Sequence, residues 1–304
     1  KYTTLEIVKQ PIALLFALLS FSLLAQEVNV GKWNIEGNYQ VCSFIKHTAK
    51  INNVPKGLTH SFELAVARKT FGEQPWHKAL NFPETGFSFT YYHFGDNKIF
   101  GDAYALTHFV KFYLFRTKVV NSYARIGVGL GFLTRHYDYI SNPNNNIVGS
   151  TVNLTFSFRL GFEWKLSKQV LLNTAFTFAH FSNGSAKLPN YGINLAMGTV
   201  GLKVYPKLGT YNYNCTKVRP KKHDEVIVRY GLGLYQKNGL NGPTYFAHVA
   251  SIAYARYTST ANKIFAGVAL EYFPGLSDFL YVNDLTSKKD AKKSDNAKET
   301  TNSP

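Results

Sequence analysis

A histidine and a serine two residues apart form a candidate nucleophile and base. Residues 172–182 alternate in character, and His180 and Ser182 fall on the same face as Phe176 and Phe178. On a strand, side chains two residues apart have Cβ atoms about 6–7 Å apart, because each residue rises ~3.3 Å. A base and a hydroxyl at this spacing can lean into hydrogen-bond reach, as nucleophilic catalysis requires. The alternative is that both residues mark the polar rim of a membrane interface, where such groups are tolerated.

The strand that would carry this pair is one of several with the same two-residue period. From residue 151 to 165 every even position is apolar, from Val152 to Trp164, and the odd positions are polar, charged or Gly. Residues 120–132, 225–234 and 263–272 alternate similarly. The pattern predicts extended strands with one apolar face, and these strands are longer than the five or six residues typical of globular proteins.

Composition narrows the class of protein. The chain has 304 residues and a net charge of +16, but only 17% of its residues are charged and 15% are aromatic. An average soluble domain has about 25% charged residues. No zinc-finger spacing, basic helix or RNA-binding aromatic signature accompanies the positive charge, so nucleic acid is not an expected partner. Cys42 and Cys215 belong to no paired motif, and their role stays open.

The two ends of the chain are expected to lie outside the fold. Residues 1–25 resemble a secretory signal peptide, with flanking lysines, a short apolar run and a small residue at the end. Residues 26–59 are assigned to an N-terminal segment and residues 60–275 to the folded domain. Residues 276–304 are polar, without an apolar period, and are expected to form a disordered tail.

These features together predict an antiparallel transmembrane β-barrel of about 8–10 strands in the outer membrane of a Gram-negative bacterium. Such barrels turn the apolar strand faces to lipid and enclose the polar ones. Nine strands are counted directly. Because single-chain bacterial barrels have even numbers, either residues 60–67 add a strand or a last strand is missing, and we expect a shortened C-terminus. A soluble exported lectin-like sandwich, with its apolar faces inside, is the structural alternative.

Turn lengths orient the predicted strands. Short connections near residues 116–118 and 166–168 contrast with the long polar segment 137–148. Short turns of such barrels are periplasmic and long loops are extracellular. The strand ending at Ser182 therefore ends at the cell exterior.

The residues that follow the His–Ser pair carry a family resemblance. The segment HFSNGSAKLPNYGIN, residues 180–194, has an H-x-S-N-G, P-N, G-x-N pattern. It resembles the lipid A 3-O-deacylases of the PagL family, including their acyloxyacyl hydrolase-like members, and a looser likeness extends from about residue 86 to 204. The resemblance implies a serine esterase that removes an ester-linked acyl chain from lipid A. It gives Ser182 the role of nucleophile and His180 that of general base, with backbone N–H groups of Asn183 and Gly184 as oxyanion donors.

One position departs from the family pattern. Where the family typically has a Glu that orients the histidine, this chain has Asn194, and no Asp or Glu occurs between Glu163 and Asp224. An Asn can accept the histidine N–H, but it carries no full negative charge. We therefore expect either a slower enzyme or a carboxylate supplied from another strand. Asn190 is a second candidate for orienting the histidine, although turn chemistry explains it more simply.

The expected partners follow from this function. Lipid A or lipopolysaccharide is the substrate, its phosphorylated surface matching the positive net charge, and membrane lipids surround the barrel. The mechanism requires no metal and no organic cofactor. The rival function is a non-catalytic barrel, either a small porin-like protein or a structural one. The acyl chain that is removed and the oligomeric state stay open.

Overall fold

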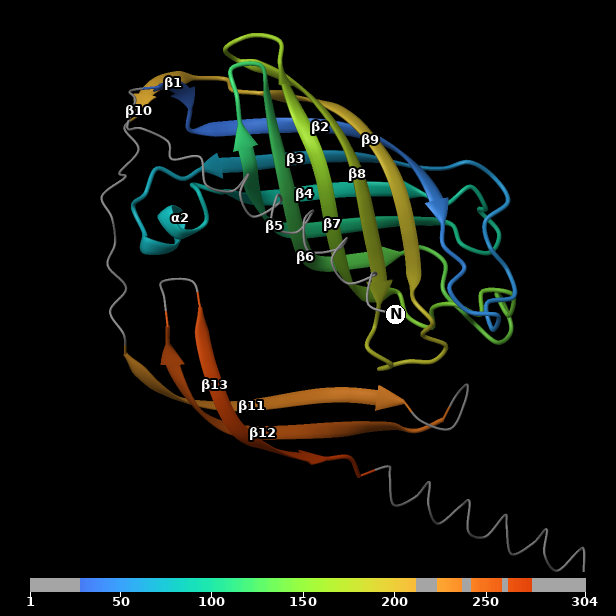
Figure 1. Ribbon diagram of the computed structural model, residues 1–304. Helices are drawn as coiled ribbons and strands as arrows, with labels where there is room; N and C mark the ends of the chain where they lie inside the picture. Colours follow the sequence, from blue (N-terminus) through green and yellow to red (C-terminus); the bar gives the residue numbers. More distant parts are fainter. Residues whose placement is uncertain (1–27, 212–222, 237–241, 259–261, 275–304) are drawn as a thin grey trace, which may run out of the picture.

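A closed eight-stranded antiparallel barrel is the main body of the protein (Figure 1). The computed structural model describes residues 28–211, 223–236, 242–258 and 262–274. Each barrel strand pairs with its neighbours in chain order, and β9 closes the barrel on β2. The predicted all-β antiparallel barrel is thus confirmed. The strands are β2 (Trp33–Phe44), β3 (Thr59–Lys69), β4 (Glu84–His93), β5 (Asp102–Arg116), β6 (Val120–Leu133), β7 (Val152–Lys165), β8 (Val170–Ser182) and β9 (Ile193–Val204).

The barrel begins earlier and ends earlier than the predicted span of residues 60–275. Its first strand, β2, lies within the segment 26–59, and its last strand ends at Val204. β2 alternates between buried and exposed residues like the other strands, with Asn34 and Glu36 inside and Ile35 outside. β3 contains residues 60–67, one of the two alternatives for the additional strand. Because β9 uses one edge for β8 and the other for β2, no edge remains for later strands.

The strands expected near residues 225–236, 243–257 and 262–273 form, but they make a separate three-stranded sheet (Figure 1). This sheet contains β11 (Asp224–Gln236), β12 (Thr244–Tyr257) and β13 (Lys263–Tyr272). A further pair joins β1 (Val28–Gly31) to β10 (Leu208–Tyr211). The proposed signal peptide, the polar tail and Cys215 lie outside the described residues.

The barrel wall is apolar outside and polar inside. Along β5, Tyr104 and Leu106 are exposed whereas Ala105 and Thr107 are buried. The same alternation runs through the other barrel strands, and β7 exposes Leu154 and Leu160. An apolar exterior around a polar interior is the arrangement of a barrel surrounded by lipid. None of the helices in the described residues has the length and hydrophobicity needed to cross a membrane.

The interior is filled by charged side chains rather than open. In its middle, Glu63 accepts hydrogen bonds from the guanidinium groups of Arg125 (2.8 and 3.1 Å) and Arg159 (2.9 and 3.1 Å). All three side chains are buried. Buried charges are stable only when they are paired and hydrogen-bonded, and this group meets that condition.

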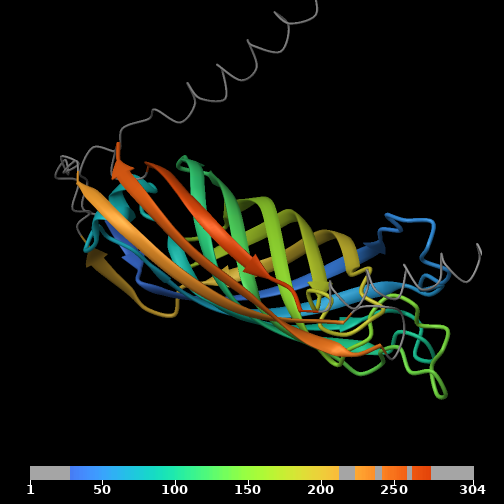
Figure 2. The ribbon, with the colours of Figure 1, turned by 90° about the horizontal axis from the view of Figure 1, so that it is seen from below.

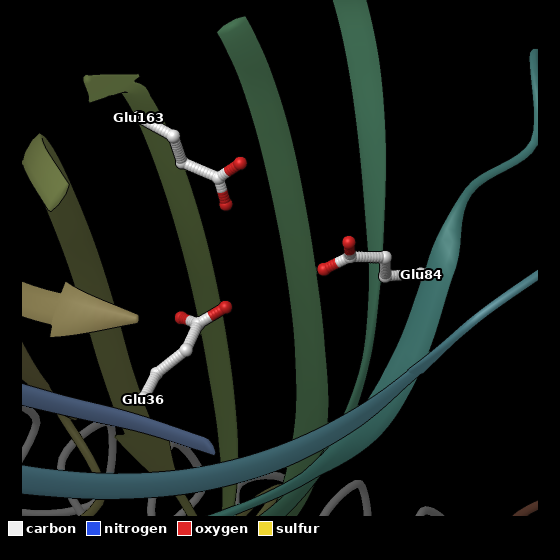
Figure 3. Close-up of side chains that lie close together, drawn as sticks. All are labelled: Glu36, Glu84 and Glu163. Atoms are coloured by element: carbon white, nitrogen blue, oxygen red, sulfur yellow. The ribbon is translucent and has the colours of Figure 1, made fainter. Parts of the chain in front are cut away.

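A second buried cluster lies nearer the short-turn end. Glu36, Glu84 and Glu163 point toward one another from three strands (Figure 3). One carboxylate oxygen of each residue lies within 4.8 Å of those of the other two. The ammonium groups of Lys111 and Lys203 lie among these carboxylates. Lys203 Nζ is 2.5 Å from Glu84 Oε2 and 2.9 Å from Glu163 Oε1. Lys111 Nζ is 2.8 Å from Glu163 Oε1 and also contacts Glu36. Lys69 Nζ also lies 3.9 Å from Glu84 Oε1, so three lysines face the three carboxylates and the cluster is an ion-pair core.

The two ends of the barrel differ in their connections. Residues 117–119 and 166–169 are short turns at one end, which also holds helix α2 (Pro75–Ala79) in the β3–β4 connection. The opposite end carries the longer loops 45–58, 134–151 and 183–192, visible together in both views (Figures 1 and 2). Strand β8 ends at this second end.

Candidate active site

The outer end of β8 places the two predicted catalytic side chains on the exterior face of the barrel. Ala179 and Phe181 are fully buried in the interior, so His180 and Ser182, which alternate with them, lie outside and are partly exposed. This agrees with the face expected from the sequence. The pair therefore lies where the barrel wall meets the long loops.

Asn194, at the start of β9, is the partner of His180. The two residues are directly paired in the β8–β9 register, and His180 Nδ1 is 2.5 Å from Asn194 Oδ1. An amide oxygen only accepts hydrogen bonds, so Nδ1 of His180 carries the proton and Nε2 is left as an acceptor. Asn194 thus occupies the position expected for the group that orients the histidine.

Ser182 is bound by the loop that follows it. Its Oγ lies 3.0 Å from Asn190 Nδ2 and 3.3 Å from Asn190 Oδ1, and it accepts a hydrogen bond from the Gly184 N–H at 3.2 Å. In the described residues His180 and Ser182 share no hydrogen bond with each other. Asn190, the second candidate for orienting His180, contacts Ser182 instead. The Asn183 N–H donates to Asn190 Oδ1 at 3.1 Å.

Loop 134–151 supports loop 183–192, which follows Ser182, from the side. The Tyr191 N–H donates to the Ile147 carbonyl at 2.8 Å, and the Asn183 side-chain amide donates to Ser150 Oγ at 2.8 Å. Val148 also forms an isolated bridge with Asn190. These contacts join segments more than 30 residues apart, and the sequence showed no signal for them beyond the turn-forming residues of loop 134–151.

Asp138 orders the outer part of loop 134–151. Its carboxylate accepts hydrogen bonds from the Ser141 N–H and hydroxyl and from the Ile140 N–H. These bonds, led by the Ser141 N–H, hold the pKa of the Asp138 carboxyl below its usual value. The carboxylate is thus held by its own loop, and its hydrogen bonds within the described residues do not include His180 or Ser182.

The separate sheet also contacts loop 183–192. The Gln236 N–H at the end of β11 donates to the Ser185 carbonyl at 2.7 Å, and its Oε1 accepts the Leu188 N–H at 2.6 Å. Neither contact was expected from the sequence. They bring β11 to the loop that holds Asn190.

No carboxylate of the described residues contacts His180. Glu63 and Glu163 of the barrel are buried in the interior and paired with arginines or lysines. The sequence predicts either a slower enzyme or a carboxylate supplied by another strand. In the described part of the chain, no other strand supplies a carboxylate to His180. The neutral amide of Asn194 is the group that His180 meets.

Residues 60–203, which include this site, match the family model described as Lipid A 3-O-deacylase (PagL). This stretch of the chain is PagL-like. The match confirms the resemblance carried by residues 180–194 and supports a lipid A deacylase. Together with the closed, apolar-faced barrel, it locates the protein in the outer membrane of a Gram-negative bacterium.

Several solved barrels have a similar fold at low sequence identity. The outer membrane enzyme PagL is 12% identical, with 56% of this chain and 98% of that chain covered and a TM-score of 0.39. Neisserial surface protein A is 10% identical; the match covers 60% of this chain and 99% of that chain, with a TM-score of 0.38. Ail, the attachment invasion locus protein of Yersinia pestis, is 14% identical; the match covers 57% of this chain and 99% of that chain, with a TM-score of 0.34. A search among curated protein sequences found no match.

Proposed function

We propose that this protein removes the ester-linked 3-O-acyl chain of lipid A by a serine mechanism. The observation that carries the proposal is the hydrogen bond between His180 Nδ1 and Asn194 Oδ1, which leaves Nε2 free to accept a proton from a serine on the same face of β8. The family match over residues 60–203 supplies the substrate class. Proton acceptor and hydroxyl both lie on the exterior face, where a lipid can reach them.

In the first half of the reaction, Ser182 Oγ attacks the ester carbonyl carbon while its proton passes to Nε2 of His180. To do so, the hydroxyl must exchange its hydrogen bond to Asn190 for one to His180. The tetrahedral intermediate then breaks its bond to the sugar oxygen, which takes the proton from His180. An acyl-serine and a lipid A with a free sugar hydroxyl result.

In the second half, water attacks the acyl-serine. His180 accepts the water proton and returns it to Ser182 Oγ as the fatty acid leaves. Throughout, Asn194 keeps the imidazole in the orientation that presents Nε2. Its dipole stabilises the imidazolium less than a carboxylate would, because it carries no net charge.

Two hydrogen-bond donors lie beside the reacting oxygen. The Gly184 N–H and the Asn190 Nδ2 are 3.2 and 3.0 Å from Ser182 Oγ. In the tetrahedral intermediate the negative charge lies on the former carbonyl oxygen, bonded to the carbon that Ser182 Oγ has attacked. Donors that turn from Oγ to this oxygen stabilise the charge where water is excluded. We assign Gly184 and Asn190 this role; the Asn183 N–H, also expected as a donor, is engaged by Asn190 Oδ1.

A porin-like function is disfavoured by the filled interior. Buried ion pairs around Glu63 and around Glu163 occupy the barrel at two levels. Small barrels of eight strands enclose just enough space for side chains. An ion or solute would have to displace these paired charges to pass.

Mass spectrometry of lipid A tests the proposal. Cells expressing the wild-type chain should yield lipid A that has lost one ester-linked acyl chain, and cells expressing Ser182→Ala should not. Ser167→Ala, in the β7–β8 turn at the opposite end, is the matched control and should retain the activity. Identical lipid A from the wild type and Ser182→Ala would refute the enzyme and leave a non-catalytic barrel.

A further inference from the structure

Asn194 lies between two histidines. Its Oδ1 is 2.5 Å from His180 Nδ1, and its Nδ2 is 2.9 Å from Nδ1 of His47, in the loop after β2. We propose that His47 is a positioning residue, which holds the Asn194 amide so that its oxygen faces the catalytic histidine. This inference rests on the proposed function and concerns a residue that the family pattern at 180–194 does not include.

An asparagine side chain needs such a partner because its amide oxygen and its NH2 group are similar in size and shape, whereas the oxygen accepts hydrogen bonds and the NH2 group donates them. If the Asn194 amide were reversed, its NH2 group would face His180 Nδ1 and make that nitrogen an acceptor. The proton of His180 would then lie on Nε2, which could no longer take the Ser182 proton. A carboxylate has two equivalent oxygens and does not face this choice. The requirement therefore arises from having Asn rather than Glu at this position.

The fold brings His47 to this place through backbone pairing. The β2–β9 register pairs Phe44 with Leu195, and the Ile45 N–H continues it by donating to the Asn194 carbonyl at 2.9 Å. Further along loop 45–58, two hydrogen bonds join it to Asn146 of loop 134–151. Asn146 Oδ1 accepts the Asn52 N–H at 3.1 Å, and Asn146 Nδ2 donates to the Lys50 carbonyl at 2.6 Å. His47 is thus held between two anchored points.

His47 is exposed, whereas Asn194 and His180 are partly buried. An exposed side chain contributes little to the packing of the barrel, so changing it should leave the fold intact. Its contact with the Asn194 amide is the interaction through which it would act. With an unprotonated Nδ1, His47 accepts the Nδ2 hydrogen and selects the productive amide orientation.

The kinetic test compares acceptor and donor side chains at position 47. In detergent-solubilised, full-length protein acting on lipid A, His47→Ala should lower kcat about threefold to tenfold, the effect of one hydrogen bond, with KM unchanged. His47→Glu, which can only accept, should keep kcat near the wild-type value. His47→Lys, which can only donate, should lower kcat further than His47→Ala.

The same substitutions in an Asn194→Glu background separate positioning from other effects. There the carboxylate has no amide to orient, so His47→Ala should change kcat less than twofold. An equal loss in both backgrounds, or no loss in the native one, would overturn the proposal. Native-like heat-dependent gel mobility of each variant serves as the folding control.

A readout independent of catalysis distinguishes this inference from the proposed function. Nitrogen-15 spectra of labelled histidines, with His180→Gln used to assign the signal, report which nitrogen of His180 carries the proton. The wild type should have it on Nδ1 and His47→Lys on Nε2. An Nε2 proton in the wild type, or one unchanged by His47→Lys, would refute the positioning role. If the spectra are as expected but the protein does not hydrolyse lipid A, only the proposed deacylase function is refuted.

Discussion

Gly192 lies so close to His180 that a Cβ atom on it would be 2.5 Å from Cε1 of the imidazole ring. The backbone of Gly192 also has φ +79°, in the left-handed region that favours glycine. Two independent constraints therefore require glycine at the residue that leads the chain back toward Asn194. The G-x-N pattern of the sequence has this structural meaning: the glycine makes room for the histidine that the asparagine orients.

Gly192→Ala should consequently displace the His180 ring and lower kcat by about tenfold or more, because small misplacements of catalytic groups are costly. The strained backbone should also destabilise the loop by about 1 kcal/mol. Lipid A deacylation rates measure the first effect. Gly198→Ala on β9, where a Cβ atom would meet nothing within 4 Å, is the matched control. Equal activity of both variants would contradict this account of Gly192.

Asn190→Asp tests the donor beside the nucleophile. The substitution keeps an acceptor for the Asn183 N–H but replaces the Nδ2 donor that lies 3.0 Å from Ser182 Oγ with an oxygen. We expect kcat to fall about 100-fold, the usual cost of losing one oxyanion donor. The rate should be measured beside that of Asn97→Asp, a similar change at an exposed residue of the β4–β5 loop. A loss below threefold would remove Asn190 from the mechanism.

Asn194→Glu should raise activity if this position orients His180. A carboxylate at the 2.5 Å contact would stabilise the imidazolium with a full charge. An increase in kcat of about tenfold, worth about 1.4 kcal/mol, is the expected result. Asn194→Ala supplies the opposite control and should lower kcat. Unchanged rates in both variants would show that Asn194 has no part in catalysis.

Lys203→Met should destabilise the barrel rather than affect catalysis directly. It removes the ammonium that contacts Glu84 and Glu163 and leaves those buried carboxylates undercompensated. Breaking a buried pair in this way costs about 3 kcal/mol or more. Urea unfolding in detergent measures the loss, with Lys118→Met, an exposed turn residue, as control. Equal unfolding midpoints would mean that the ion-pair core adds no stability.

The local properties of the barrel could be obtained from the sequence. Alternation along each strand is a short-range pattern, so it predicted which residues of β7 and β8 face outward. For the same reason it placed His180 and Ser182 on one exterior face. The motif at residues 180–194 identified Asn194 as the partner of His180 by its family position, and the structure pairs the two residues across β8 and β9.

Closure of the barrel was decided only in the tertiary structure. The sequences of β11 and β13 alternate like those of the barrel strands, and nothing in this pattern tells a barrel strand from one in a separate sheet. The deciding event is the pairing of β9 with β2, which are far apart in the chain. That pairing uses the last free edge, and it depends on hydrogen bonds between strands rather than on any property of one strand.

The surroundings of His180 and Ser182 were likewise set by long-range pairing. His47 is 147 residues before Asn194 and reaches it because β2 closes the barrel against β9. Ser182 bonds to Asn190 because loop 134–151 holds the returning chain near it. The sequence by itself determined which residue types are present and which strand face they share. Their hydrogen-bond partners were determined by the three-dimensional fold, because each partner comes from a segment that only barrel closure and loop packing bring near.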